Sequence, residues 1–163
     1  MDNVKYVSYS DWSLLISEIM KKGLACEELN KIQDVYPHSV GESYDAMIYN
    51  QLARLEQYMI RETVNIFQKQ MKACIDEIDL EMAEGAFIRL KKHYMRCMFF
   101  LQIPDYPESV KNKMSEEIIR NMQSFSGSFL KYLKKLEYED NSTFIQDYVY
   151  VCKKNLKKIE NMY

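Results

Sequence analysis

Proline and glycine are scarce in this chain, and their scarcity argues against most sheet-based folds. The 163 residues include 3 prolines and 4 glycines, whereas sheet proteins need turn-forming residues between many short strands. Between Gly41 and Pro104 lie 62 residues with no proline and one glycine, Gly85. This run favours helix, because proline and glycine are the residues that most destabilise helix interiors.

One continuous helix over this run would be too long for a compact domain. It would span roughly 93 Å, against a radius of gyration of about 15 Å for a domain of this size. Segment 76–84 is acidic without basic residues, and segment 88–96 is basic without acidic ones. A helix favours acidic groups at its N-terminus and basic groups towards its C-terminus. We therefore predict a turn at 76–80, with Asp79 as the N-cap of the next helix.

Apolar periodicity and caps predict the remaining elements. Ser10 is expected to cap the first helix, and Ser39 with Glu42 and Thr143 with Gln146 fit capping boxes. The expected helices cover residues 11–22, 25–34, 41–75, 79–103, 108–136 and 144–159. The predicted fold is all-α, an antiparallel up-down-up-down four-helix bundle (40–163) with one or two extra N-terminal helices (1–36) packed on it. We expect a single helical domain, 1–163.

Several sequence signals of known chemistries are absent. No Gly-x-Gly or Gly-Lys pair occurs, which argues against a P-loop. The cysteines Cys26, Cys74, Cys97 and Cys152 have no C-x-x-C spacing, so zinc and thioredoxin-like sites are not predicted. All but Cys26 lie on apolar stripes, and we interpret them as buried thiols of a cytoplasmic protein. No signal peptide and no membrane-spanning stretch is expected.

The two histidines do not support a metal site. Neither His38 nor His93 follows a glutamate by three residues, as the di-metal helical bundles require. His93 is expected on the surface. Cys97 lies four residues after His93, but interior helix amides are already hydrogen-bonded and provide no oxyanion hole. We therefore predict no catalytic residue, no metal and no cofactor, and interpret the chain as a non-enzyme.

A short segment resembles the start of the helical chorismate mutases, which surround a dicarboxylate with arginine and lysine. The resemblance rests on the sequence 75–79 and on Arg89 ten residues after Asp79. Gly85 and Ala86 stand where that family has bulky aliphatic residues, and Phe99 and Phe100 occupy the following stretch where the family's pattern has a lysine. The sequence therefore departs from the family's pattern, and we do not assign it that activity.

Charge is distributed unevenly along the chain. Residues 1–84 carry 15 acidic and 8 basic side chains, and residues 85–163 carry 9 acidic and 14 basic ones, within a total net charge of −2. In an antiparallel bundle the helices over 79–103 and 144–159 run the same way, so their basic halves should lie towards one end. The candidate partner-binding residues are Arg89, Lys91, Lys92, Arg96, Lys153, Lys154, Lys157 and Lys158.

The leading functional hypothesis is a non-catalytic protein-interaction module, such as a regulator, inhibitor or adaptor with an acidic protein partner. The 13 tyrosines favour this reading, because tyrosine is enriched at protein interfaces. The composition, rich in Lys, Ile, Tyr, Asn and Met, suits a low-GC bacterium or its mobile elements. Homodimerisation through exposed apolar surface stays open.

Two alternatives come from other functional classes. The basic residues could bind nucleic acid, although a pI near 5.8 is low for such a domain. A helical small-molecule sensor or enzyme could instead have an inter-helix cavity beside the small residues Ala83, Gly85, Ala86 and Gly127.

Overall fold

A computed structural model describes residues 5–38, 41–101 and 107–162. The chain divides into two compact units. The first, here called the N-terminal unit, comprises Met1–Arg61 and Met95–Ser115. The second, here called the bundle unit, comprises Glu62–Tyr94 and Glu116–Tyr163. The single domain predicted from the sequence stays a prediction.

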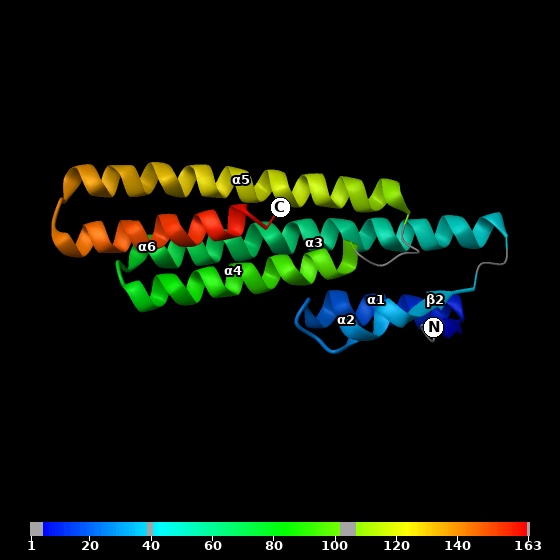
Figure 1. Cartoon of the computed structure of the whole chain (residues 1–163). Coiled ribbons are helices and arrows are strands. Elements are labelled where there is room, and N and C mark those ends of the chain that lie inside the picture. The colour runs from blue at the N-terminus through cyan, green and yellow to red at the C-terminus, as the bar shows by residue number, and fades with distance from the viewer. Residues whose placement is uncertain (1–4, 39–40, 102–106, 163) are drawn as a thin grey trace. The chain divides into compact units, whose positions relative to one another are not determined.

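The predicted all-α, up-down-up-down bundle is confirmed. It is formed by α3 (Glu42–Asp76), α4 (Leu80–Leu101), α5 (Glu108–Glu139) and α6 (Thr143–Glu160). In the bundle unit these helices run alternately in opposite directions (Figure 1). Aromatic rings fill its core, where Phe67 of α3 stacks on Phe125 of α5 and Phe87 of α4 packs on Phe129 of α5.

The predicted turn after α3 is present. Helix α3 ends at Asp76 and α4 begins at Leu80. The Met82 amide donates a 2.8 Å hydrogen bond to Oδ1 of Asp79, which is the bond an N-cap side chain makes. Of the stripe expected from the sequence, helix α4 buries Phe87, Leu90, Tyr94 and Cys97, while Leu101 is half-buried.

The apolar stripes of the other long helices are also largely confirmed. Every predicted core residue of α6 is buried, namely Ile145, Tyr148, Val149, Cys152, Leu156 and Ile159. Helix α5 buries Val110, Met114, Ile118, Met122, Phe129 and Leu133, while Phe125 and Leu136 stay half-buried. Among the described residues, no helix combines the length and hydropathy needed to cross a membrane.

The N-terminal unit differs from the prediction in its details. Ser8, not Ser10, caps α1 (Tyr9–Lys22), and its Oγ accepts from the Asp11 amide at 3.1 Å. The predicted helix over 25–34 is shorter, with α2 (Glu28–Lys31) followed by the 3-10 turn η1 (Ile32–Asp34). The sequence also missed a two-stranded parallel sheet, β1 (Lys5–Val7) and β2 (Val35–Pro37).

These differences have local physical causes. The strands have only three residues each, too short to show an alternating pattern. Long-range pairing of Tyr6 with Tyr36, whose ring centroids lie 6.3 Å apart, accompanies the strand pairing. Ser10 lies within α1 because Ser8, two residues earlier, already provides the cap oxygen.

At the start of α6 the cap is Ser142 rather than Thr143, with the Ile145 amide donating to Ser142 Oγ at 3.4 Å. Thr143 is instead the first residue of the helix. The predicted cap Ser39 and the end at Ile103 of the helix predicted over 79–103 lie outside the described residues.

Candidate functional site

Helices α4 and α6 lie side by side and parallel in the bundle unit. The turns that precede them share one end, where Tyr148 of α6 donates a hydrogen bond to the Cys74 carbonyl near the end of α3. Farther along, the Tyr94 hydroxyl of α4 donates to the Met162 carbonyl beyond α6 at 2.9 Å. The second half of α4 in this unit is therefore level with the second half of α6, as the sequence predicted.

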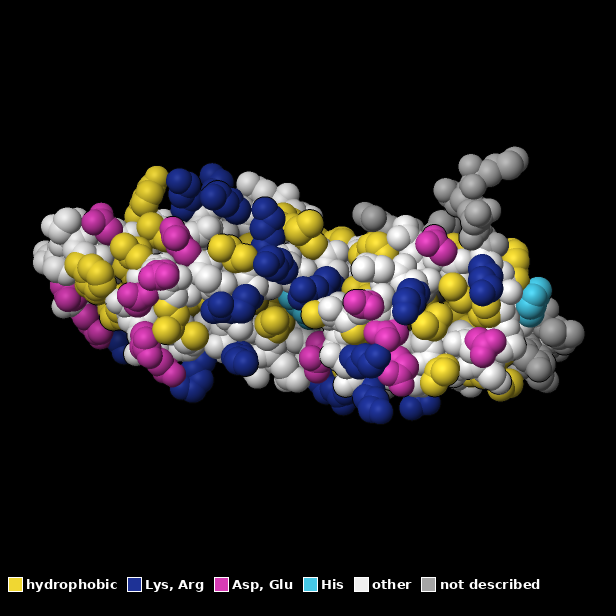
Figure 2. Space-filling view, turned by 90° about the horizontal axis from the view of Figure 1, so that it is seen from below, with side chains coloured by type: hydrophobic (Ala, Val, Ile, Leu, Met, Phe, Trp, Pro, Cys, Tyr) yellow, Lys and Arg dark blue, Asp and Glu magenta, His cyan; other side chains and the backbone are white. Residues whose placement is uncertain are grey.

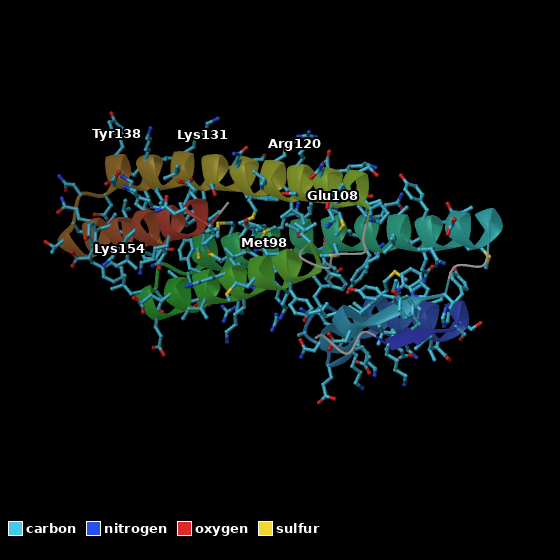
Figure 3. All side chains as sticks on the ribbon, turned by 45° about the vertical axis from the view of Figure 1, so that its right-hand side comes forward. Met98, Glu108, Arg120, Lys131, Tyr138 and Lys154 are labelled. Carbon is cyan, nitrogen blue, oxygen red and sulfur yellow. The ribbon has the colours of Figure 1, made fainter. Side chains whose placement is uncertain are left out.

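Seven of the eight predicted partner-binding residues belong to the bundle unit. Five of them are exposed lysines, here called the basic surface: Lys91, Lys92, Lys154, Lys157 and Lys158. Figure 2 shows Lys and Arg side chains gathered on the face of this unit where α4 lies, and Figure 3 labels Lys154 on α6. Within the described part of the chain, none of these five lysines has an ion pair or a hydrogen-bond partner.

The other predicted residues are placed differently. Lys153 is half-buried and pairs with Glu137 of α5 at 3.0 Å. The Arg89 guanidinium is exposed but donates from Nε to Gln70 of α3 at 2.7 Å. Arg96 is half-buried and belongs to the N-terminal unit. Lys153 and Arg89 therefore join helices within the bundle unit, and the five other lysines are the ones available to a partner.

Two exposed apolar side chains border the basic surface. Ile88 of α4 is 55% exposed and precedes Lys91 and Lys92 by about one helical turn. Tyr150 of α6 is 66% exposed and stands one turn before Lys154. From the sequence, Tyr150 was counted only as one of the 13 tyrosines, and Ile88 was not singled out. Ile88 lies off the buried stripe of α4, and this position was the signal that could have identified Ile88 as exposed.

The exposed residues of the two helices follow the same order. Along α4 they run from Glu84 to Ile88 to Lys91, and along α6 from Asp147 to Tyr150 to Lys154. Because the helices are parallel, acidic residues lie towards the turn end of the bundle and lysines towards the other end. On each helix one exposed apolar side chain, Ile88 or Tyr150, lies between the acidic residue and the lysines.

The small residues proposed to line an inter-helix cavity do not do so. Ala83 and Ala86 are fully buried in the core. Gly127 is exposed, and a Cβ added there would meet no atom within 4 Å. Gly85 borders an open depression whose described lining comes from Asp79 and the first turns of α4, with Arg89 beside it. A cavity between helices does exist in the bundle unit, but it lies between α3 and α5.

His93 is buried, which corrects the expectation of a surface residue. Its Nε2 lies 2.9 Å from Oγ1 of Thr63 on α3. The sequence could not show this, because the hydroxyl partner lies 30 residues away in the chain. The described residues contain no group of three or more His, Cys, Asp or Glu side chains placed to hold a metal ion.

Three titratable side chains near the turn end are held neutral by the core. Burial raises the pKa of the Cys74 thiol to about 11 and that of the Cys152 thiol to about 12. Burial also raises the pKa of Tyr148, whose hydroxyl donates to the Cys74 carbonyl. A thiol with a pKa this high is a poor nucleophile at neutral pH, because the thiolate is the reactive form.

These thiols yield a direct prediction. A short pulse of iodoacetamide at neutral pH is expected to modify Cys26, which is half-buried, and to spare Cys74, Cys97 and Cys152, which are buried. The same pulse in strong denaturant should modify all four, and peptide mass spectrometry distinguishes the sites. Modification of Cys74 or Cys152 at the rate of Cys26 in the native state would contradict the placement of these thiols in the core.

The basic surface is the feature that best unites the predicted residues with the observed geometry. It carries five exposed lysines, and the exposed apolar side chains Ile88 and Tyr150 lie one turn before them on their helices. Comparisons of the chain with protein-family models, with curated proteins and with solved structures returned no match.

Proposed function

We propose that this chain is a non-catalytic interaction module, a regulator, inhibitor or adaptor that binds an acidic protein through the basic surface. The observation that carries the proposal is the repeated order of acidic, apolar and lysine residues on the parallel helices α4 and α6. The lysines there have no partner among the described residues. Lysine carries a large rotamer entropy, and a partner's carboxylates would be needed to order it.

The apolar pair favours a protein over a nucleic acid. Ile88 and Tyr150 offer apolar area of the kind found at the centre of protein interfaces, where charged residues are depleted. Glu84 and Asp147 lie about one turn away from this pair and would repel a phosphate backbone. An acidic protein segment with apolar anchors matches both features. The four cysteines are present as thiols, which fits a reducing compartment, so we place the interaction in the cytoplasm.

The test compares two variants with the same change in charge. Lys91→Glu/Lys154→Glu reverses one charge on each helix of the basic surface. Lys131→Glu/Lys134→Glu makes the same change on α5, where Lys131 extends away from the other helices (Figure 3). Tagged wild-type and variant proteins are isolated from native cells, and the proteins that accompany them are quantified.

We expect one acidic protein to accompany the wild type in stoichiometric amount. Its recovery should fall at least about tenfold with Lys91→Glu/Lys154→Glu, because like charges placed together at an interface cost several kcal/mol. Recovery with the α5 variant should equal that of the wild type. Equal recovery with both variants would refute the basic surface as the binding site, even if a partner is found.

Nucleic-acid binding is the second candidate, favoured only by the exposed lysines. It predicts that affinity for a duplex or a single strand falls steeply as salt rises from about 50 to 200 mM. We expect weak binding to both, with no difference between them. If the chain bound nucleic acid tightly, if the affinity fell steeply with salt, and if Lys91→Glu/Lys154→Glu abolished the binding, nucleic-acid binding would replace the protein-partner proposal.

A further inference from the structure

A cavity opens between α3 and α5 in the bundle unit, on surface formed by neither α4 nor α6. The two helices are parallel here, since Phe67 stacks on Phe125 and, farther along both, the Tyr132 hydroxyl lies 3.5 Å from the Ile75 carbonyl. Between these contacts the helices leave a space of about 280 Å³, partly open to solvent. Its position is fixed at both ends by side chains that join α3 to α5.

The floor of the cavity is apolar. Met71 and Phe129 line it and are buried, and Phe125 lines it half-buried. Ile75, at the Tyr132 end, is 43% exposed. The thioether of Met71 is flexible and polarizable, so it can adapt to a ligand that enters beside it. An apolar floor left open to water is costly, and filling it removes that area from solvent.

Three polar residues border the cavity, whose own surface is almost wholly apolar. Gln68 and Lys72 of α3 and Ser128 of α5 line it and are exposed. Lys72 pairs with Asp76 one turn later, but both side chains are exposed, and such surface pairs contribute little. A ligand carboxylate could therefore replace Asp76 as the partner of Lys72 at small cost. The short side chain of Ser128 leaves open the space between its larger neighbours.

We propose that this cavity binds a medium-chain aliphatic carboxylate. Its chain would lie on Met71, Phe125 and Phe129, and its carboxylate would meet the Lys72 ammonium and the Gln68 amide. At the interior packing density of about 0.74, the cavity takes roughly 200 Å³ of ligand, the size of a chain of roughly eight to ten carbons. An apolar pocket with a few polar groups that fix orientation is typical of small-molecule sites. This site is independent of the basic surface.

The test uses octanoate and 1-octanol, which share a chain length and differ in charge. Isothermal titration calorimetry measures affinity, and the methyl resonance of Met71 reports where the ligand lies. We expect octanoate to bind the wild type with a Kd on the order of 0.1–1 mM, with octanol weaker. The Met71 methyl resonance should shift in proportion to saturation.

Three variants separate the contributions. Ser128→Trp places a large side chain in the cavity and should weaken octanoate at least about tenfold, whereas Gln123→Trp, at an exposed α5 position outside the described lining, should bind as the wild type does. Lys72→Met should weaken octanoate and leave octanol unchanged. Circular dichroism confirms that each variant is folded.

Two results would refute ligand binding at this cavity. One is the absence of saturable octanoate binding to the folded wild type. The other is binding that is unaffected by Ser128→Trp or that leaves the Met71 resonance unmoved, since the ligand would then lie elsewhere. If octanol bound as tightly as octanoate and Lys72→Met left the octanoate affinity unchanged, the carboxylate would have no role in binding. The assignment of a carboxylate ligand would then be refuted.

Discussion

Replacing Phe129 by alanine is expected to lower the free energy of unfolding by about 3–5 kcal/mol. The ring is buried and packs on Phe87 of α4 with centroids 6.2 Å apart. It also stacks on Tyr132 of α5 at 5.8 Å. Alanine would remove these aromatic contacts and enlarge the space beside α3. Urea denaturation followed by far-ultraviolet circular dichroism measures the change.

Phe144→Ala is the matched control. This ring is 52% exposed at the start of α6, so its removal should change the free energy of unfolding by less than about 0.5 kcal/mol. If both variants lost the same stability, the assignment of Phe129 to the core of the bundle unit would be wrong. A small loss in both would point to the same conclusion.

Replacing Ile16 by alanine should lower the stability of the N-terminal unit by about 2–5 kcal/mol. Ile16 is fully buried on α1, one turn after the buried Trp12. Because Trp12 is the single tryptophan of the chain, its fluorescence reports on this unit, while circular dichroism is dominated by the long helices. A single urea titration therefore reports on the N-terminal unit through tryptophan fluorescence and on the long helices through circular dichroism.

We expect the fluorescence and circular dichroism transitions of Ile16→Ala to shift together, because α3, α4 and α5 each contribute residues to both units. Coincident transitions are the signature of one cooperative domain. Separate transitions would refute the predicted single domain. Leu14→Ala, at a position 60% exposed on the same helix, is the control and should move neither transition measurably.

The fold class was predictable because the long helices carry consistent local signals. Apolar residues recur at helical spacing on α5 and α6, and the acidic cluster before Leu80 marks the turn at Asp79. Both signals act within a few residues, so they can be recognised in the sequence. The short strands β1 and β2 are different, because each is stabilised by a partner about 30 residues away.

The candidate sites likewise have parts that the sequence predicted and parts that it did not. The lysines of the basic surface were found from the sequence, since charge is visible in composition. The pairing of Arg89 with Gln70 and of Lys153 with Glu137 was not, because each joins two helices. The α3–α5 cavity was also missed. It depends on how α3 and α5 pack against each other, whereas the small residues chosen from the sequence lie in packed or open positions.

The sequence by itself determined that this chain is helical, where α3 ends and α4 begins, and most of the apolar side chains that the long helices bury. Those properties follow from propensity, capping and periodicity, which are set by near neighbours in the chain. The tertiary structure alone decided that His93 is buried against Thr63, that Arg89 bonds to Gln70, and that α3 and α5 leave a cavity. Each depends on contacts between helices, whose packing register no local pattern encodes.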